Sequence, residues 1–248
     1  MSLAINTILW NDLSMGDSQK KIGLIGGTFD PVHNGHLNLA EQAQKKFELD
    51  KVIFIPAYRS PHKLGIEPAS SEDRLAMLAL ALNDQPYFSM DKLEVNNGKV
   101  SYTIETLGTL KADHPDWNLF LILGADAFQT IDTWKQASRL LEFCSILVGS
   151  RPGVELKFLE SLKKKLFNNE AGMKNGPSGF EPDKTVIENP EKGNKVNFFQ
   201  IPLLDISSKD IRKRIKRGEE IKNLLPLNVD HYIMQHRLYR DIPSPIVT

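Results

Sequence analysis

Cysteine is nearly absent from this chain of 248 residues. The single cysteine, Cys144, excludes an intrachain disulfide and indicates a reducing compartment. It lies in the apolar segment LLEFCSILVG, where a thiol behaves as a small hydrophobic side chain. We therefore expect Cys144 to be buried and to have no role as a nucleophile.

Long apolar runs are also missing. The longest, LAMLALAL at 75–82, falls far short of the roughly 20 residues that span a bilayer, and it lies in a helical pattern. The first 21 residues contain no basic region followed by an apolar core, so we expect no secretory signal. These absences predict a cytoplasmic protein without a membrane partner.

An excess of either charge is lacking as well, since lysine plus arginine and aspartate plus glutamate both number 31. No overall field therefore favours nucleic acid or an anionic membrane, and any anion site must be local. The basic residues of 213–217 are expected to form a solvated helix face, because no aromatic residues alternate with them as in a nucleic-acid surface.

The chain does contain a regular alternation of short β-rich runs and longer helical patterns from Lys20 onward. Such alternation predicts an α/β fold, a doubly wound parallel sheet with helices on both faces and a C-terminal helical segment. The expected strands are 21–27, 51–57, 87–95, 118–126, 145–151 and 197–203. The first expected helix begins at Gly35, with Asn34 as its cap. The other expected helices cover 70–84, 101–113, a stretch holding Trp134 and Leu140–Leu141, and 206–218.

One domain over 20–240 accounts for this rhythm, with tails at 1–19 and 241–248. The rhythm is interrupted by an insertion at about 154–196. There an amphipathic segment, read as an ordinary surface helix, precedes a stretch rich in glycine, proline and asparagine that predicts a long exposed loop.

The segment GGTFDPVHNGHL at 26–37 connects the first expected strand to the first expected helix. It matches neither a Walker loop nor a dinucleotide fingerprint. Gly26 and Gly27 let a ligand approach the backbone closely, and the helix N-terminus near Gly35 suits a phosphate. His33 and His36 can donate hydrogen bonds to the same anion. Zinc binding by these two histidines is disfavoured, because no matching set of glutamate or cysteine ligands accompanies them, so we expect no metal site in the protein.

Three further polar segments follow expected strands: 57–63, 124–128 and ISSKDIR at 206–212. In a doubly wound sheet the carboxyl ends of the strands lie at one edge, and ligands bind there. Lys63 offers a mobile cation, and Ser207, Ser208 and Arg212 form a second anion cradle, although the serine pair could also be no more than a helix cap. No nucleophile with its base is visible, so the pattern favours direct phosphoryl or nucleotidyl transfer.

Together, GGTFDPVHNGH and ISSKDIR resemble the two signature motifs of the nucleotidyltransferase superfamily, which has a Rossmann-like fold. Within it, the chain is similar to the bacterial nicotinate-nucleotide adenylyltransferases. The supporting segments run in family order and are SPHK (60–63), VSYTIETL (100–107), LILGADAF (121–128) with Trp134, VGSRPG (148–153) and LLPLNVDHYIMQHRLY (224–239).

The resemblance implies transfer of the adenylyl group of ATP to nicotinate mononucleotide in NAD biosynthesis, with Mg²⁺ carried by the ATP phosphates. It implies that His33 and His36 contact the ATP phosphates as catalytic groups. Lys63, Ser207, Ser208 and Arg212 would hold the departing pyrophosphate. The nucleotide sites would be lined by Gly26, Gly27, Thr28, Phe29, Gly35, Gly124 and Asp126, and the nicotinate would be bound by Tyr102, Thr103 and Trp134.

Two departures from the family pattern stand out: Lys209 replaces a threonine, and Asn96–Lys99 replaces a turn that commonly contains arginine. Two alternatives stay open at this point. One is a sister enzyme acting on nicotinamide mononucleotide or phosphopantetheine, and the other is a nucleotide-binding regulator without catalysis.

Overall fold

The computed structural model describes residues 19–61, 67–150, 186–188, 193–202 and 204–240. Residues 1–18 of the predicted N-terminal tail lie outside these ranges. So do the tail at 241–248, most of the predicted insertion, His62 and Lys63. No helix within the described ranges combines the length and apolar character needed to cross a bilayer.

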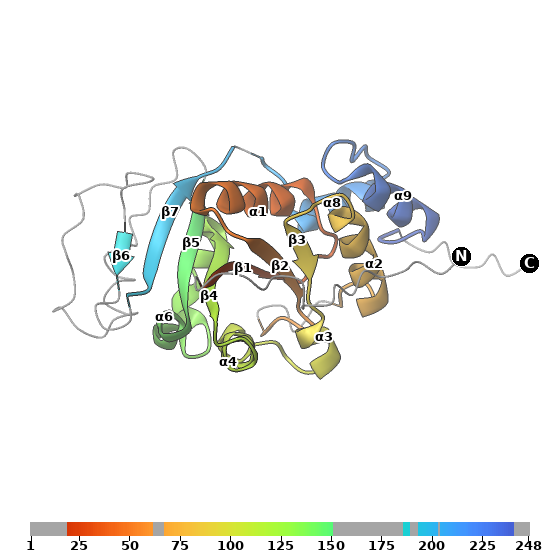
Figure 1. The fold of residues 1–248 in the computed structure, drawn as a ribbon. Coiled ribbons are helices and arrows are strands. Elements are labelled where there is room, and N and C mark those ends of the chain that lie inside the picture. The colour runs from red at the N-terminus through yellow and green to blue at the C-terminus, as the bar shows by residue number, and fades with distance from the viewer. Residues whose placement is uncertain (1–18, 62–66, 151–185, 189–192, 203, 241–248) are drawn as a thin grey trace, which may run out of the picture.

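A seven-stranded sheet runs through the centre of the molecule (Figure 1). Its order is β3-β2-β1-β4-β5-β7-β6, and every neighbouring pair is parallel except β6 with β7. The strands are β1 (Lys20–Gly27), β2 (Lys51–Pro56), β3 (Phe88–Met90), β4 (Trp117–Gly124), β5 (Cys144–Ser150), β6 (Val186–Glu188) and β7 (Lys195–Gln200). The order reverses between β1 and β4, which confirms the doubly wound sheet and puts its switch point at the end of β1.

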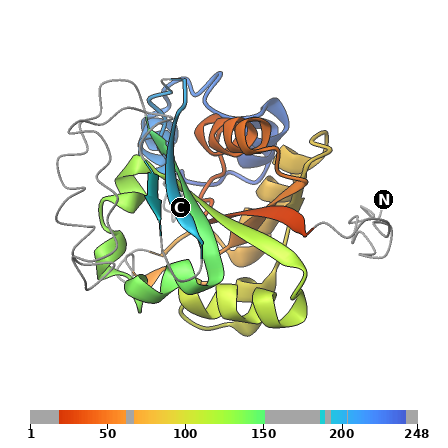
Figure 2. The same ribbon diagram turned by 60° about the vertical axis from the view of Figure 1, so that its left-hand side comes forward.

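Helices cover both faces of the sheet (Figures 1 and 2). One face carries α1 (Asn34–Phe47), α2 (Ser71–Leu82), α8 (Ser208–Arg217) and α9 (Leu227–Gln235). The other carries α3 (Leu93–Asn97), α4 (Thr103–Asp113), α5 (Ala125–Phe128), two 3₁₀ turns at Ile131–Thr133 and Ala137–Arg139, and α6 (Leu140–Phe143).

Side chains of the sheet alternate between the two faces, as the pleat requires. Leu24, Ile53 and Leu121 are paired neighbours that pack in the cluster on the α4 side. Ile25 and Phe54, one residue further along, pack in the cluster on the α1 side. Because both faces are buried, these strands read as continuous apolar runs in the sequence.

Helix ends follow the predicted signals at three places. The Ser70 hydroxyl accepts the Asp73 N–H at 3.0 Å to start α2, and the Ser207 hydroxyl accepts the Asp210 N–H at 3.1 Å to start α8. At Gly218 the chain takes a left-handed conformation with φ 70° and α8 ends.

The helical stretch expected around Trp134 is present as two 3₁₀ turns followed by α6. Three other expectations about secondary structure are wrong. The expected strand 87–95 is a three-residue strand followed by helix α3. Strand β6 pairs with β7 in a segment expected to be loop. His33, not Asn34, precedes α1, because the Asn34 side-chain amide donates to the Asn223 carbonyl at 2.8 Å.

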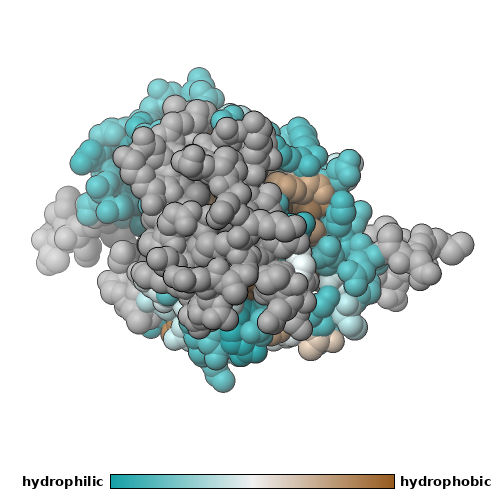
Figure 3. Space-filling model, turned by 90° about the vertical axis from the view of Figure 1, so that its left-hand side faces the viewer, coloured by the Kyte–Doolittle hydropathy of each residue, from teal (hydrophilic) through white to brown (hydrophobic). Residues whose placement is uncertain are grey.

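Cys144 is fully buried in β5, as expected. Burial raises the pKa of its thiol to about 12, so it stays protonated and is no nucleophile. Among the described residues visible in Figure 3, hydrophilic side chains predominate, and the most prominent hydrophobic area lies at the upper right.

Candidate active site

The loop that leaves β1 opens onto a cavity. A Cβ built on Gly26 would meet no atom within 4 Å, so the space beside this backbone is unfilled by protein. The Thr28 hydroxyl, which lines the same cavity, is buried and has no hydrogen-bond partner among the described residues. A buried polar atom without a partner is rare and indicates a missing ligand atom or water.

The two histidines lie together where this loop enters α1. Their rings stack with centroids 3.6 Å apart, and the His33 N–H donates to Nδ1 of His36 at 3.2 Å. This hydrogen bond assigns the proton of a neutral His36 ring to Nε2. Because Nδ1 is already occupied as an acceptor, Nε2–H is the group that His36 can offer to a ligand.

His33 is buried, and burial lowers its pKa to about 4, so the ring is neutral at pH 7. Its Nδ1 is a second buried polar atom with no partner in the described part of the chain. Gly35 provides the room for this ring, since a Cβ there would lie 3.0 Å from Nδ1. The structure therefore places Gly35 as the neighbour of His33 in the first turn of α1.

Phe29, predicted to line the nucleotide site, has its ring in the core, 1% exposed. The ring meets His36 edge-on, with centroids 5.1 Å apart, and its backbone takes a left-handed conformation with φ 49°. Phe29 thus supports the His36 ring through this edge-on contact from the core.

Helix α8 docks its first turn on the same loop. The Ser208 hydroxyl donates to the Pro31 carbonyl at 2.9 Å, and Nη1 of Arg212 donates to the Asp30 carbonyl at 2.6 Å. Arg212 also lies 3.4 Å from Oδ2 of Asp30. The two motifs that lie far apart in the sequence therefore meet, and the Arg212 side chain stays 27% exposed at their junction.

Asp30 is a buried carboxylate that the sequence analysis overlooked. Its Oδ1 accepts the Tyr239 hydroxyl at 2.8 Å and the Ala69 N–H at 3.1 Å. Burial, together with the Asp30 charge, raises the pKa of the Tyr239 phenol, which therefore remains the proton donor. Asp30 links the loop after β1, the start of α2 and the C-terminal segment.

Arg74, in the first turn of α2, was overlooked as well. It is 1% exposed, and burial lowers the pKa of its guanidinium. The guanidinium donates five hydrogen bonds, to the carbonyl oxygens of Thr28, Ala57, Tyr58 and Ala69 and to the hydroxyl of Ser71. Arg74 thereby fastens together the loops that follow β1 and β2.

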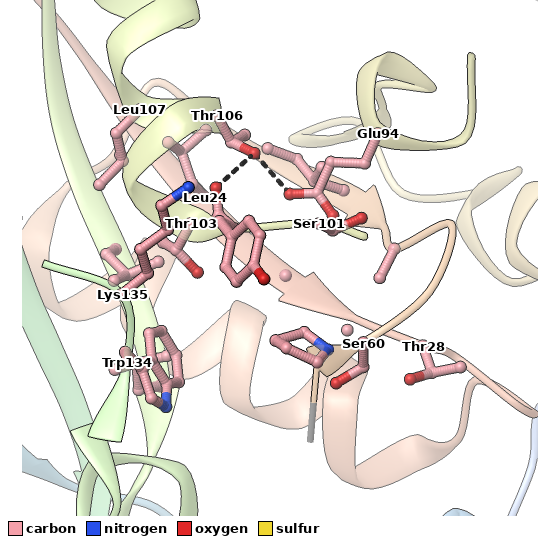
Figure 4. A pocket seen from close by; sticks show the side chains of 18 of the residues that line it. Leu24, Thr28, Ser60, Glu94, Ser101, Thr103, Thr106, Leu107, Trp134 and Lys135 are labelled. Atoms are coloured by element: carbon pink, nitrogen blue, oxygen red, sulfur yellow. Dashed lines mark hydrogen bonds between the residues drawn. The ribbon is translucent and has the colours of Figure 1, made fainter. Parts of the chain in front are cut away.

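The cavity itself measures about 230 Å³ and lies between the carboxyl ends of β1, β2 and β4 and the N-terminus of α4 (Figure 4). Tyr102, Thr103 and Trp134, predicted as substrate-binding residues, all line it together with Gly26, Gly27 and Thr28. Lining residues that the sequence analysis missed are Ser60, Glu94, Ser101, Thr106 and Lys135.

Glu94 enters the cavity wall from α3. It accepts the Thr106 hydroxyl at 2.6 Å, and Thr106 also donates to the Tyr102 carbonyl at 3.4 Å. Burial raises the pKa of the Glu94 carboxyl. These contacts fix the turn that presents Tyr102 and Thr103 (Figure 4).

Gly124 and Asp126 lie at the carboxyl end of β4, next to β1 in the sheet. A Cβ on Gly124 would meet nothing within 4 Å, and Asp126 is exposed in α5. Neither residue lines the 230 Å³ cavity. The remaining predicted site residue, Lys63, lies outside the described residues.

Comparisons with known proteins agree with this geometry. Residues 24–214 match the family model described as cytidylyltransferase-like. The chain is 40% identical over 222 residues to a probable nicotinate-nucleotide adenylyltransferase of Desulfitobacterium hafniense (strain Y51), covering 89% of this chain and 96% of that one. A relative of the same name from Citrifermentans bemidjiense is also 40% identical, with 89% and 99% covered.

Among solved structures, the chain is similar to the Plasmodium falciparum nicotinic acid mononucleotide adenylyltransferase complexed with NaAD. The TM-score is 0.64 at 19% identity, and 89% of this chain and 97% of that one are covered. At this identity the likeness shows the fold alone, whereas the match to the curated relatives extends over most of both chains. This protein therefore belongs to the nicotinate-nucleotide adenylyltransferase family, as the motifs indicated.

Proposed function

We propose that the protein transfers the adenylyl group of ATP to nicotinate mononucleotide in NAD biosynthesis. A phosphate oxygen of the mononucleotide attacks the α-phosphorus of ATP, the bond from that phosphorus to the bridging oxygen breaks, and pyrophosphate leaves with the electron pair. The products are nicotinate adenine dinucleotide and pyrophosphate. Family membership supports the reaction. The observation that carries it to these residues is the cavity beside Gly26. Tyr102 and Trp134 line it together with Thr28, whose buried hydroxyl has no hydrogen-bond partner among the described residues.

The two ends of the β1–α1 loop suit two parts of the reaction. The cavity offers Tyr102 and Trp134 as aromatic faces for the pyridine ring, and Thr103 as a donor to its carboxylate. His33 and His36, at the start of α1, donate to the ATP phosphates and oppose the charge that develops on them. The position of five further residues at this edge of the sheet assigns them to the nucleotide site: Gly26, Gly27, Thr28, Gly124 and Asp126. Phe29 and Gly35 act indirectly, by supporting the two histidines.

The anion site at the start of α8 binds the leaving group in this proposal. The departing pyrophosphate is held by Ser207, Ser208, Lys63 and Arg212. Asp30 already orients the Arg212 guanidinium. ATP enters as its Mg²⁺ complex, as a substrate, with the metal bound mainly through the phosphates. A cytoplasmic location and the lack of nucleic-acid partners remain predictions from the sequence.

A substrate panel tests the reaction. Pyrophosphate release is measured with Mg²⁺-ATP and nicotinate mononucleotide, nicotinamide mononucleotide or phosphopantetheine as acceptor. We expect the highest kcat/KM for nicotinate mononucleotide. Preference for either other acceptor identifies a sister enzyme, and nucleotide binding without turnover identifies a regulator; both results contradict the proposal.

Replacing Gly35 with alanine tests the role assigned to His33. The added Cβ would lie 3.0 Å from Nδ1 and 3.1 Å from Cε1 of His33, so the ring must shift. We expect kcat to fall about tenfold or more, because small displacements of catalytic groups are costly. The melting temperature is measured alongside kcat, so that a loss of activity in the folded variant is distinguished from unfolding.

The matched control is Gly108→Ala in α4, where a Cβ would approach Phe143 Cε1 no closer than 4.0 Å. Its kcat should equal that of the wild type. If Gly35→Ala keeps full kcat, the tight fit between Gly35 and His33 has no bearing on catalysis.

A further inference from the structure

Lys135 is the one cationic side chain among the described residues that line the cavity. Its ammonium nitrogen lies 4.3 Å from the centroid of the Tyr102 ring, over the aromatic face. The residue before it, Trp134, lines the same cavity. The position of Lys135 therefore adds a positive charge to the wall that the proposed function assigns to the pyridine ring.

A carboxylate partly balances this charge from outside the cavity. Oε1 of Glu105, which is not a lining residue, lies 2.5 Å from Nζ of Lys135. This hydrogen bond raises the pKa of Lys135, so the ammonium stays protonated at neutral pH. The two side chains are 45% and 54% exposed, so ions in solution screen the pair.

The other ionisable groups of the wall already have partners within the protein. The Glu94 carboxyl accepts the Thr106 hydroxyl at 2.6 Å, and burial raises its pKa. Tyr102 contributes its ring to the cation–π contact. A ligand carboxylate in this cavity would thus meet one exposed cation, whereas a neutral carboxamide would gain little from it.

We propose that Lys135 is a specificity-determining residue that favours an anionic pyridine substituent over a neutral one, and that Glu105 reduces this preference by pairing with Lys135. The inference rests on the proposed function and deepens it. It predicts opposite effects from the two partners, which a merely structural ion pair would not give.

The test compares kcat/KM for nicotinate mononucleotide with kcat/KM for nicotinamide mononucleotide. For Lys135→Gln we expect this acid-to-amide ratio to fall about fivefold, mainly through a higher KM for the acid, as suits one half-exposed charge. For Glu105→Gln we expect the ratio to rise about twofold. The double variant should match Lys135→Gln, because Glu105 acts through Lys135. Lys135→Arg should restore the wild-type ratio, and the differences should shrink in high salt.

Lys45→Gln is the matched control, because Lys45 forms an exposed pair with Glu41 at the same distance, 2.5 Å, in α1. Its ratio should equal that of the wild type. If Lys135→Gln lowers both kcat/KM values equally, or neither, the inference fails while the proposed function stands. If the wild type uses neither mononucleotide, the proposed function itself fails.

Discussion

Replacing His36 with alanine is expected to lower kcat by about 10²–10³-fold, the usual cost of removing one donor to a developing negative charge. The Nδ1 atom of His36 accepts the His33 backbone N–H, so in the proposed role the ring donates through Nε2. Phe29 fixes the ring edge-on, and His33 stacks on its other side. The donor is therefore held in place before the substrates bind, and its loss should affect the transition state most.

Binding of the mononucleotide should change little in this variant, because the pyridine cavity is lined by other residues. Pyrophosphate release gives kcat, and calorimetric titration gives the dissociation constant of nicotinate mononucleotide. His231→Ala serves as control, since His231 is exposed on α9. An unchanged kcat for His36→Ala would remove His36 from the mechanism, and equal losses in binding and in kcat would make it a general binding residue.

The parallel sheet could be predicted because its strands are buried on both sides. Within the expected strands 21–27 and 145–151, residues 22–25 and 146–149 carry no polar side chain, which is typical of a doubly covered sheet. The wrong assignment of 87–95 has a local cause. The Asp91 carboxylate accepts the Leu93 N–H at 2.8 Å and Gly98 takes φ 64°, so a short helix begins within this stretch and ends just after it. Aspartate before the turn and glycine after it were the available signals.

Strand β6 could not be predicted in the same way. Val186 and Ile187 are the apolar residues of a three-residue strand in a segment rich in turn-forming residues. Its strand conformation depends on pairing with β7, which is a tertiary contact. A segment of three residues is too short to show the alternating pattern of a strand.

The residues of the candidate site also fall into two groups, those that local motifs reveal and those that only the fold reveals. Residues that we propose to contact a ligand, such as His36 and Tyr102, lie in local motifs that the sequence shows directly. A second group, Asp30, Arg74 and Glu94, forms hydrogen bonds with segments that are distant in the sequence. The fold brings these segments together, so the sequence alone does not identify the hydrogen-bond partners. Arg74 did leave one trace in the sequence, since it lies on the apolar face of α2 with Met77, Leu78 and Ala81. A cation at that position predicts a buried guanidinium with dedicated acceptors.

Replacing Arg74 with methionine is expected to reduce the free energy of unfolding by about 3–5 kcal/mol. Methionine keeps much of the side-chain volume, so the loss comes from the hydrogen bonds. Four carbonyl oxygens and a hydroxyl would lose a charged donor. Urea unfolding measures the change. Arg139→Met is the matched control, because the Arg139–Glu142 pair is about half exposed and should contribute less than about 0.5 kcal/mol. A wild-type midpoint for Arg74→Met would show that water replaces the guanidinium without cost.

Arg74→Lys separates the effect on stability from the effect on catalysis. Nη1 of Arg74 donates to the Thr28 and Ala57 carbonyls, both at 2.8 Å, and so joins the loop that carries the histidines to the loop after β2. A lysine keeps the charge, but its compact ammonium cannot reproduce the planar fork that reaches all these acceptors. We expect a folded protein whose kcat falls about tenfold, because the β1–α1 loop loses part of its fixed geometry. If Arg74→Lys is folded and has full kcat, then Arg74 stabilises the fold without positioning the site, since the two loops would hold their geometry with one fastening removed.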